Sequence, residues 1–367
     1  MLFCRDKHPW RVRALILLAL AIGLFVYSRS FHPEREDAPG QRALLAKRVP
    51  AALPARVDAA SLLGDVRALA APEMEGRAVG TLGGERARDY LRARYGALGL
   101  QPVGAGFDQP FSFTPGRGIR FWRGTFWQTP QPVHGANLVG KITGSVEPGK
   151  YLVLSAHYDH LGIRAGKLYP GADDNASGVA ALLAAASYFR QHPPRHSLLL
   201  VAFDGEESGL RGARAYVENP PVALAVTLLD INFDMLSRSP AGEIFLTGLH
   251  ANPQLRALLD PVRARAVPSI LYGHDFPRPF WSGDDWTNSS DHGAFNDKGI
   301  PFIYLGVEDH PDYHQPSDTF ARLDQTFYTA VANSMVDIII ALDAAPDQQL
   351  AKHQPTGDGM AAPATAP

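Results

Sequence analysis

The sequence predicts an α/β fold for its central block: a three-layer sandwich with a mixed, mostly parallel central sheet and helices on both faces. Between about residues 57 and 345, short apolar runs alternate with longer amphipathic stretches, an order typical of strands and helices that share one sheet. The runs are continuously apolar instead of alternating with polar residues. This pattern is expected of strands that are buried on both faces.

Five apolar runs are suited to buried strands. They lie at residues 151–156, 197–203, 223–233, 243–247 and 301–305. Four other segments have helical spacing, at residues 84–98, 177–190, 253–264 and 324–342. Asn252 and Pro253 are the cap and first residue expected of the third helix. The central block therefore predicts a sheet with interspersed helices.

The first 29 residues have the layout of an export signal, which adds an N-terminal membrane segment to the predicted fold. A positive stretch precedes an uninterrupted apolar run at residues 14–27. This run is shorter than the roughly 20 residues that span a bilayer, although flanking Arg29 and Trp10 can reach the interface. Because no clear cleavage site follows, we expect an uncleaved signal anchor, with a cleaved signal peptide or a buried helix as alternatives. Positive-inside orientation then places the later chain on the extracytoplasmic side of the cell membrane, periplasmic or extracellular, and a cleaved signal would make it secreted.

The remaining chain divides by composition. Residues 30–56 are charged and interrupted by proline, which predicts a tether, and residues 346–367 have few large apolar side chains, which predicts a disordered tail. No second linker interrupts residues 57–345. We therefore expect one catalytic domain across this block.

Composition excludes several classes of protein and of site. The formal net charge of −2 argues against a nucleic-acid binder that depends on phosphate neutralisation. The single cysteine, Cys4, excludes an intramolecular disulfide and a thiolate zinc site. A metal site in this chain must therefore use histidine and carboxylate side chains.

Histidines and carboxylates follow the predicted strands at the points where the strands end or in the adjoining loops. They are His157, Asp159 and His160, Asp173 and Asp174, Asp204, Glu206 and Glu207, Asp234, and His310, Asp312 and His314. Ligands of α/β sheets bind at the carboxyl ends of the strands. Carboxylates gathered there repel one another and lose solvation unless a cation compensates them. Nitrogen and oxygen ligands without sulfur suit zinc, and less firmly manganese or cobalt.

Six motifs in order, HYDH, GADDNASG, DGEESGLRG, NFDM, SSDHGAF and YHQPSDT, resemble those of the co-catalytic di-zinc aminopeptidases of bacteria. That family of zinc exopeptidases includes glutamate carboxypeptidases and glutaminyl cyclases, and the resemblance covers roughly residues 58–345. It implies two zinc ions per chain, with Mn²⁺ or Co²⁺ as possible substitutes. It also implies hydrolysis of terminal peptide bonds in peptide substrates.

The resemblance assigns roles residue by residue. The metal ligands are His157, Asp174, Glu207, Asp234 and His314: His157 and Asp234 hold one ion, Glu207 and His314 hold the other, and Asp174 bridges them. Glu206 is the general base and Asp159 orients His157, as ligating histidines require. This division also solves a chemical problem, because two adjacent acids cannot easily serve one site in the same role. The resemblance further implies a cis peptide bond between Asp174 and Asn175.

Several alternatives stay open at this point. Asp173 could replace Asp174 as the bridge; otherwise it is solvated or forms a turn. His160 and His310 match no metal position and are interpreted as loop or outer groups. Residues 290–292 support the site or contact substrate, and residues 272–286 line a specificity pocket or form a self-packed loop.

The activity also has alternatives. A glutaminyl-cyclase-like cyclotransferase with one zinc is expected to lack the first histidine, which is present as His157. A carboxypeptidase-type member of the same family is another alternative. A receptor-like homologue without catalysis is expected to have lost ligands or the base, all of which this chain retains.

Overall fold

The structure is a computed structural model, and it describes residue 41 and residues 54–115, 131–275 and 285–351. The predicted membrane segment at residues 14–27 lies outside the described residues, as do most of the predicted tether and of the predicted tail.

Within the described residues, nine strands form one sheet in the order β1-β3-β7-β4-β8-β11-β9-β10, with β2 also paired to β3. The strands are β1 (Gln101–Pro102), β2 (Asp108–Phe113), β3 (Val133–Ile142), β4 (Glu147–His157), β7 (His196–Phe203), β8 (Thr227–Phe233), β9 (Glu243–Thr247), β10 (Ser269–Tyr272) and β11 (Phe302–Gly306). A separate hairpin joins β5 (Gly162–Arg164) to β6 (Lys167–Tyr169). All five predicted strands are present, although the third begins at Thr227 because residues 224–226 form a 3₁₀ turn.

The sheet is mixed, as predicted, but not mostly parallel. The central strands β7, β4, β8 and β11 run parallel to one another, and β10 runs parallel to β9. Four further pairings, at and near the two edges, are antiparallel. The prediction of a mostly parallel sheet therefore holds for the centre alone, because β3 and β9, which flank the four central strands, run antiparallel to β7 and β11.

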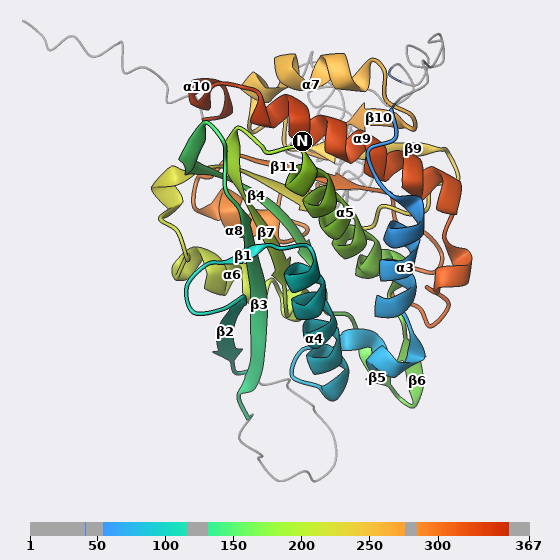
Figure 1. The fold of residues 1–367 in the computed structure, drawn as a ribbon. Helices are drawn as coiled ribbons and strands as arrows, with labels where there is room; N and C mark the ends of the chain where they lie inside the picture. The colour runs from blue at the N-terminus through green and yellow to red at the C-terminus, as the bar shows by residue number, and fades with distance from the viewer. Residues whose placement is uncertain (1–40, 42–53, 116–130, 276–284, 352–367) are drawn as a thin grey trace, which may run out of the picture.

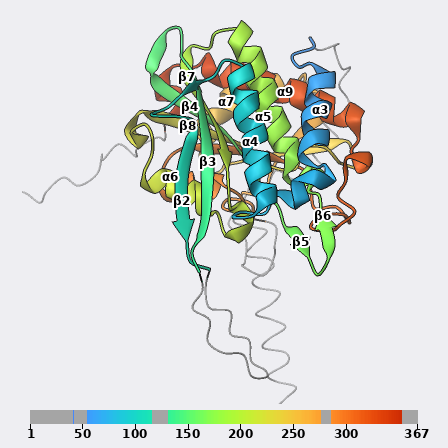
Figure 2. The same ribbon diagram turned by 60° about the horizontal axis from the view of Figure 1, so that its bottom comes forward.

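Helices cover both faces of the sheet, which gives the predicted three layers (Figures 1 and 2). The helices are α3 (Ala59–Leu69), α4 (Leu82–Ala97), α5 (Gly178–Gln191), α6 (Arg211–Glu218), α7 (Arg256–Arg263), α8 (His292–Asp297), α9 (Gln325–Asp343) and α10 (Asp347–Leu350). Helices α3, α4, α5, α7 and α9 contribute to the larger core on one face. Helices α6 and α8 contribute to a smaller core on the other.

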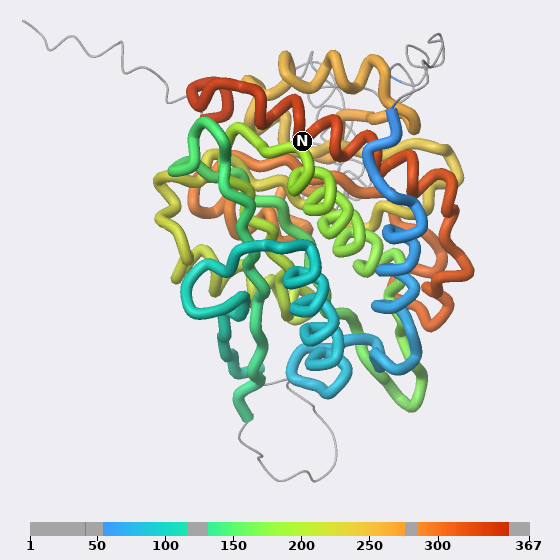
Figure 3. Tube along the Cα trace, in the orientation of Figure 1, coloured from blue at the N-terminus to red at the C-terminus, as the bar shows by residue number. Residues whose placement is uncertain are grey.

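The two cores explain why the strands are continuously apolar. In β7, Leu198 and Leu200 belong to the larger core, whereas Leu199 and Val201 belong to the smaller one. Successive side chains of a strand point to opposite faces, so a sheet covered on both sides buries all of them. The larger core also joins distant parts of the sequence, since α3 lies beside α9 in the chain trace (Figure 3).

The folded contacts extend slightly beyond residues 57–345. Arg56 forms an ion pair of 2.9 Å with Asp337 of α9. Leu350 of α10 is fully buried, so the start of the predicted tail packs on the domain. Helix α9 is the one described helix long and apolar enough to span a membrane, and 61% of its apolar window is buried inside the molecule. It packs as a core helix of the domain.

Candidate metal centre

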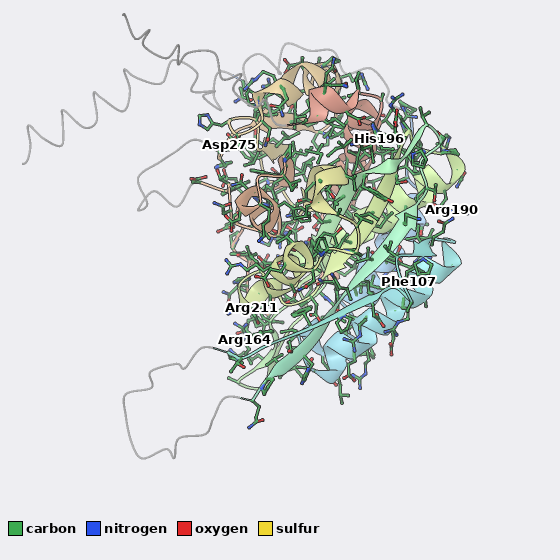
Figure 4. The ribbon with its side chains drawn as sticks, turned by 90° about the vertical axis from the view of Figure 1, so that its left-hand side faces the viewer. Phe107, Arg164, Arg190, His196, Arg211 and Asp275 are labelled. Carbon is green, nitrogen blue, oxygen red and sulfur yellow. The ribbon has the colours of Figure 1, made fainter. Side chains whose placement is uncertain are left out.

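The predicted site residues gather at the carboxyl ends of the central strands, because β4, β7, β8 and β11 run parallel and end on the same side of the sheet. Figure 4 shows His196, at the start of β7, and Arg211, shortly after its end, at opposite ends of the sheet. The site lies at the end marked by Arg211. A cavity of about 320 Å³ opens there, and its lining includes all five predicted ligands together with Glu206.

Asp174 occupies the middle of the cluster. Its Oδ1 atom lies 3.5 Å from Nε2 of His157, and its Oδ2 atom lies 3.1 Å from Nε2 of His314. Nε2 of His157 is also 3.2 Å from Oδ1 of Asp234, and Nε2 of His314 is 3.3 Å from Oε2 of Glu207. We call His157, Asp174 and Asp234 the first centre, and Asp174, Glu207 and His314 the second centre. The Asp174–Asn175 peptide bond is cis, as expected.

The neighbouring Asp173 points elsewhere. Its Oδ1 atom accepts hydrogen bonds from the backbone N–H and the hydroxyl of Ser237, both at 2.8 Å, and its Oδ2 atom lies 3.0 Å from Nε2 of His310. Asp173 was expected to be solvated or to form a turn, and the first alternative was wrong, because the side chain is fully buried. Its oxygens are engaged in holding the loops after β8 and β11, so it offers none to the cavity.

Asp159 lies behind His157 and binds the loop that carries the two glutamates. Its carboxylate accepts hydrogen bonds from the backbone N–H groups of Glu206 and Glu207, at 3.0 and 3.4 Å. Its Oδ1 atom is 3.7 Å from Nδ1 of His157, whereas its own carbonyl oxygen is closer, at 3.2 Å. Asp159 therefore faces His157 with both its backbone and its side chain.

Burial and the neighbouring ionisable groups shift the pKa values of several side chains in the site. Burial alone would lower the pKa of His314, but hydrogen bonds to Asp174 and Glu207 raise it to about 10. Burial raises the pKa of Glu206 well above its usual range, with Asp291 and Asp234 adding to the effect against His157. Burial also opposes ionisation of Glu207, yet His160 and His314 lower its pKa well below the usual range. A bound cation would lower the pKa of every carboxyl group here.

The donor set fits divalent metal ions. In each of two groups, His157 with Asp174 and Asp234, and His160 with Asp174 and Glu207, one ligand atom per residue lies within 4.8 Å of the others. Oε1 of Glu207 is buried 2.7 Å from Nδ1 of His160, without a hydrogen bond of good geometry, and a buried carboxylate oxygen needs a cation or a donor. Imidazole and carboxylate ligands without sulfur suit zinc.

The residues of the SSDHGAF motif lie next to the cavity. Ser290 accepts a hydrogen bond from Asn232, and Nε2 of His292 lies 2.8 Å from the carbonyl oxygen of Trp286. Trp286 and Ser289 line the cavity itself, so residues 285–292 contribute support and wall together. Part of the predicted pocket segment, residues 276–284, lies outside the described residues.

A model of peptidase family M28 matches residues 137–339, which is more than half of the sequence. This chain belongs to peptidase family M28. The match confirms the resemblance to zinc exopeptidases that the six motifs indicated.

Curated relatives of this M28 chain match only part of it. Aminopeptidase YwaD of Bacillus subtilis is 28% identical over 199 residues, which cover 52% of this chain and 40% of the relative. Two proteins of Pyrenophora species, each described as a probable zinc metalloprotease, are 34% identical over 113 residues, or 30% of this chain. The chain spans about a quarter of the length of these two relatives, 26% and 24%.

Solved structures share the fold. An aminopeptidase from Aneurinibacillus sp. strain AM-1 has a TM-score of 0.60 at 14% identity, with 82% of this chain and 95% of that chain covered. A glutaminyl cyclase from Porphyromonas gingivalis has a TM-score of 0.59 at 18% identity, with 78% and 99% covered. At these identities the likeness shows a mixed α/β fold of the zinc-exopeptidase type.

One residue beside the site, Arg77, has no counterpart among the sequence predictions for this M28 domain. Arg77 is fully buried and donates hydrogen bonds to the carbonyl oxygens of Tyr158, Pro170 and Gly171, which lie in the loops that carry His157 and Asp174. His160 was interpreted as a loop or outer group, and its Nδ1 atom lies 2.7 Å from Oε1 of Glu207, a predicted ligand. The sequence signal for Arg77 is a lone arginine in the turn-rich segment EMEGR, which by itself indicates no partner.

Proposed function

We propose that the chain is a zinc-dependent exopeptidase that hydrolyses terminal peptide bonds. We propose further that it acts as an aminopeptidase and binds two zinc ions per chain. His157 and Asp234 hold one ion, Glu207 and His314 hold the other, and Asp174 bridges them. Family membership supports the hydrolase class. The substrate direction and the two-ion count are part of the proposal.

The main support for two metal ions is the position of the Asp174 carboxylate. The two carboxylate oxygens of Asp174 face different histidines, Oδ1 toward His157 and Oδ2 toward His314. A carboxylate that serves a single ion does not need a separate imidazole opposite each oxygen. This arrangement is expected of a bridging ligand between two ions.

The chain's own residues supply the proton transfers. Two bound zinc ions would lower the pKa of a water between them and polarise the substrate carbonyl. Glu206 lines the same cavity but lies in neither metal-binding group, so its carboxylate is free to accept a proton from the attacking water. It then gives the proton to the departing amine. Burial raises the pKa of Glu206 above its usual range, and two bound ions would act in the opposite direction.

The cavity suits an apolar terminal residue. Met235, Trp286, Tyr304, Val307 and Tyr313 line it beside the proposed metal ligands. Apolar and aromatic walls with a few polar groups are typical of pockets that bind a side chain and orient it. We therefore expect substrates with large apolar first residues.

Metal analysis combined with a substrate panel tests the proposal. The purified protein should contain two zinc ions and hydrolyse aminoacyl anilides and dipeptides, leucyl and phenylalanyl substrates first. Activity should disappear with a chelator and return with Zn²⁺, Mn²⁺ or Co²⁺. Full activity with a zinc content well below two per chain would contradict the two-ion site.

The same panel separates the alternatives. Peptides with an N-terminal glutamine would be cyclised by a glutaminyl-cyclase-like enzyme, a candidate because such enzymes share the fold. N-blocked peptides cleaved from the carboxyl end would indicate a carboxypeptidase. Cleavage of free-amino substrates alone supports the aminopeptidase.

We also propose that residues 14–27 anchor the domain in the cell membrane as a single pass, with the catalytic domain on the extracytoplasmic side. The apolar run and its positive flank support this topology. Protease accessibility of intact cells or spheroplasts tests it: the domain should be digested without lysis and should sediment with membranes. A soluble, shortened product in the medium would indicate a cleaved signal peptide.

A further inference from the structure

We propose that His274 is a positioning residue for the substrate pocket. Its imidazole holds the indole of Trp286 in place, and through that indole it sets the preference for a large apolar terminal residue. The proposal rests on the exopeptidase function and the apolar pocket proposed above. His274 is not among the described residues that line the cavity, and it lies in neither metal-binding group. It therefore acts on the substrate through Trp286, which does line the cavity.

The imidazole of His274 lies flat against the indole of Trp286. The ring centroids are 3.8 Å apart and the ring planes are inclined by 11°, which is a stacked arrangement. The side chain of His274 is 11% exposed, so the stack is largely shielded from water. Contact between aromatic rings contributes energy beyond the area that it buries. The imidazole therefore keeps the indole from moving toward its side.

Two further rings contact the same indole from strands of the sheet. Phe245 of β9 is 5.7 Å from Trp286 at an angle of 76°, and Tyr304 of β11 is 5.8 Å away at 83°. Phe245 also packs edge-on against His274, at 4.4 Å and 71°. Stacked and edge-on contacts together restrict both the tilt and the position of the Trp286 side chain.

The backbone of Trp286 is held separately from its side chain. Its N–H donates a hydrogen bond of 2.6 Å to the carbonyl oxygen of His274, and its carbonyl oxygen lies 2.8 Å from Nε2 of His292. The bond to His274 uses a backbone oxygen, so it does not depend on the side chain at residue 274. A substitution of His274 therefore tests the ring contact alone.

The same imidazole reaches the loop after β11. Nε2 of His274 lies 3.0 Å from Oε1 of Glu308, and the residues on either side of Glu308, Val307 and Asp309, line the cavity. Glu308 is 58% exposed, so the ion pair contributes little energy and serves to orient the imidazole. His274 thus stands between two parts of the cavity wall, and it can set the width of the pocket without touching the substrate.

His274→Asn tests this role. The backbone at residue 274 has a φ of +60°, a left-handed conformation that Asn tolerates better than most residues. The variant therefore removes the ring with little strain in the turn. We expect the ratio of kcat/KM for leucyl over alanyl anilide to fall by about 10-fold or more, as for one missing methylene group in an apolar pocket. The change should lie in KM for the leucyl substrate, with kcat and zinc content at the wild-type values.

Two further variants separate the ring contact from a general loss of stability. His274→Phe keeps a flat ring against the indole and should keep most of the wild-type ratio. Trp286→Ala should itself lower the ratio, and adding His274→Asn to it should lower the ratio no further, as a double-mutant cycle shows for residues that act together. The matched control is His192→Asn, because the imidazole of His192 stacks on Tyr188 at 4.1 Å and 11° and neither residue lines the cavity. This control should have the wild-type ratio.

The outcomes distinguish three claims. A wild-type ratio in His274→Asn, or single effects that multiply in the double variant, overturns the positioning role and leaves the exopeptidase function intact. A His274→Phe variant as unselective as His274→Asn overturns it too. Equal kcat/KM for leucyl and alanyl anilide in the wild type overturns the apolar pocket together with this inference. A wild type that hydrolyses no aminoacyl substrate overturns the aminopeptidase function as well.

Discussion

The backbone N–H of Glu206 donates a 3.0 Å hydrogen bond to Oδ1 of Asp159, which joins the loop after β7 to the loop after β4. The residue proposed as general base is thereby positioned by the residue that lies behind a proposed ligand, His157. The bond is to the backbone of Glu206, so its carboxylate stays available to the cavity. The proposed metal binding and the proposed proton transfer would therefore depend on one shared carboxylate.

Replacing Glu206 by Gln should remove the general base without removing the metal. We expect kcat to fall by about 10²–10⁴-fold, the range for a positioned general base, and the zinc content to stay at the wild-type value. Steady-state kinetics with an aminoacyl anilide and metal analysis of the same sample measure both. Glu218→Gln, at an exposed position of α6, is the matched control. A Glu206→Gln variant with full activity would refute the proposed base.

The adjacent residues Asp173 and Asp174 should behave differently when each is changed to Asn. Asp174→Asn should abolish activity and weaken zinc binding, since this side chain faces both His157 and His314. Asp173→Asn should retain zinc but lower the free energy of unfolding by about 1–3 kcal/mol, because Asp173 accepts hydrogen bonds inside the protein from Ser237 and Ser177. Chelator competition and urea denaturation distinguish the two. Equal loss of zinc in both variants would contradict the assignment of the bridge.

Arg77 should contribute much of the stability of the site loops. Its guanidinium donates to four backbone carbonyl oxygens, those of Leu69, Tyr158, Pro170 and Gly171. Arg77→Met leaves these acceptors without their donor, so we expect the free energy of unfolding to fall by about 4 kcal/mol or more. Zinc affinity should fall as well, because Tyr158 follows His157 in sequence.

Urea denaturation of the metal-free and zinc-loaded forms measures both effects of the Arg77 variant. Arg86→Met is the control, since Arg86 is half exposed and pairs with a partly exposed Glu75; its change should be below about 1 kcal/mol. An Arg77→Met variant of wild-type stability would show that the four hydrogen bonds contribute little.

His292 should make the protein less stable in mild acid. Burial lowers the pKa of His292 to about 4, whereas in the unfolded chain it is about 6.5. Above pH 6.5 both states are neutral at this site and its contribution is complete. As the pH falls from 6.5 to 4, the unfolded state takes up a proton that the folded state refuses, so stability is lost across that window, by up to roughly 3 kcal/mol.

His292→Gln removes this titration and retains a donor that can reach the carbonyl oxygen of Trp286, the partner of Nε2 in the wild type. We expect the wild-type advantage in unfolding free energy to shrink by roughly 3 kcal/mol between pH 7 and pH 4. Urea denaturation of the two metal-free proteins at several pH values gives the difference. Parallel stability curves for the two proteins would mean that His292 titrates normally.

The sequence alone predicted the strands that carry the site and the residues at their ends. Continuous apolar runs marked β4, β7, β8 and β11, because strands covered on both faces need no polar alternation. Residues just beyond the ends of parallel strands come together whatever the loops do, so His157, Glu207 and Asp234 could be assigned to one cluster. The cis bond at Asp174 followed from the resemblance and is present.

Other features could not be predicted from the amino-acid sequence. Strands β2 and β3 lack a clear boundary signal, since polar residues such as His134 and Asn137 interrupt the apolar run of β3. The burial of Asp173 depends on Ser237 and His310, which lie 64 and 137 residues away in sequence. Local pattern contains no information on such partners.

The class of fold, the end of the sheet where the predicted site residues lie, and the histidines and carboxylates available there could all be predicted from the amino-acid sequence. Strand periodicity and strand ends encode these features locally. Folding of the whole chain sets which side chain each oxygen of Asp174 and Glu207 faces, and it brings His160 and Arg77 next to the predicted ligands. These relationships depend on how separate loops pack around buried polar atoms, and the distances between residues far apart in sequence settle them.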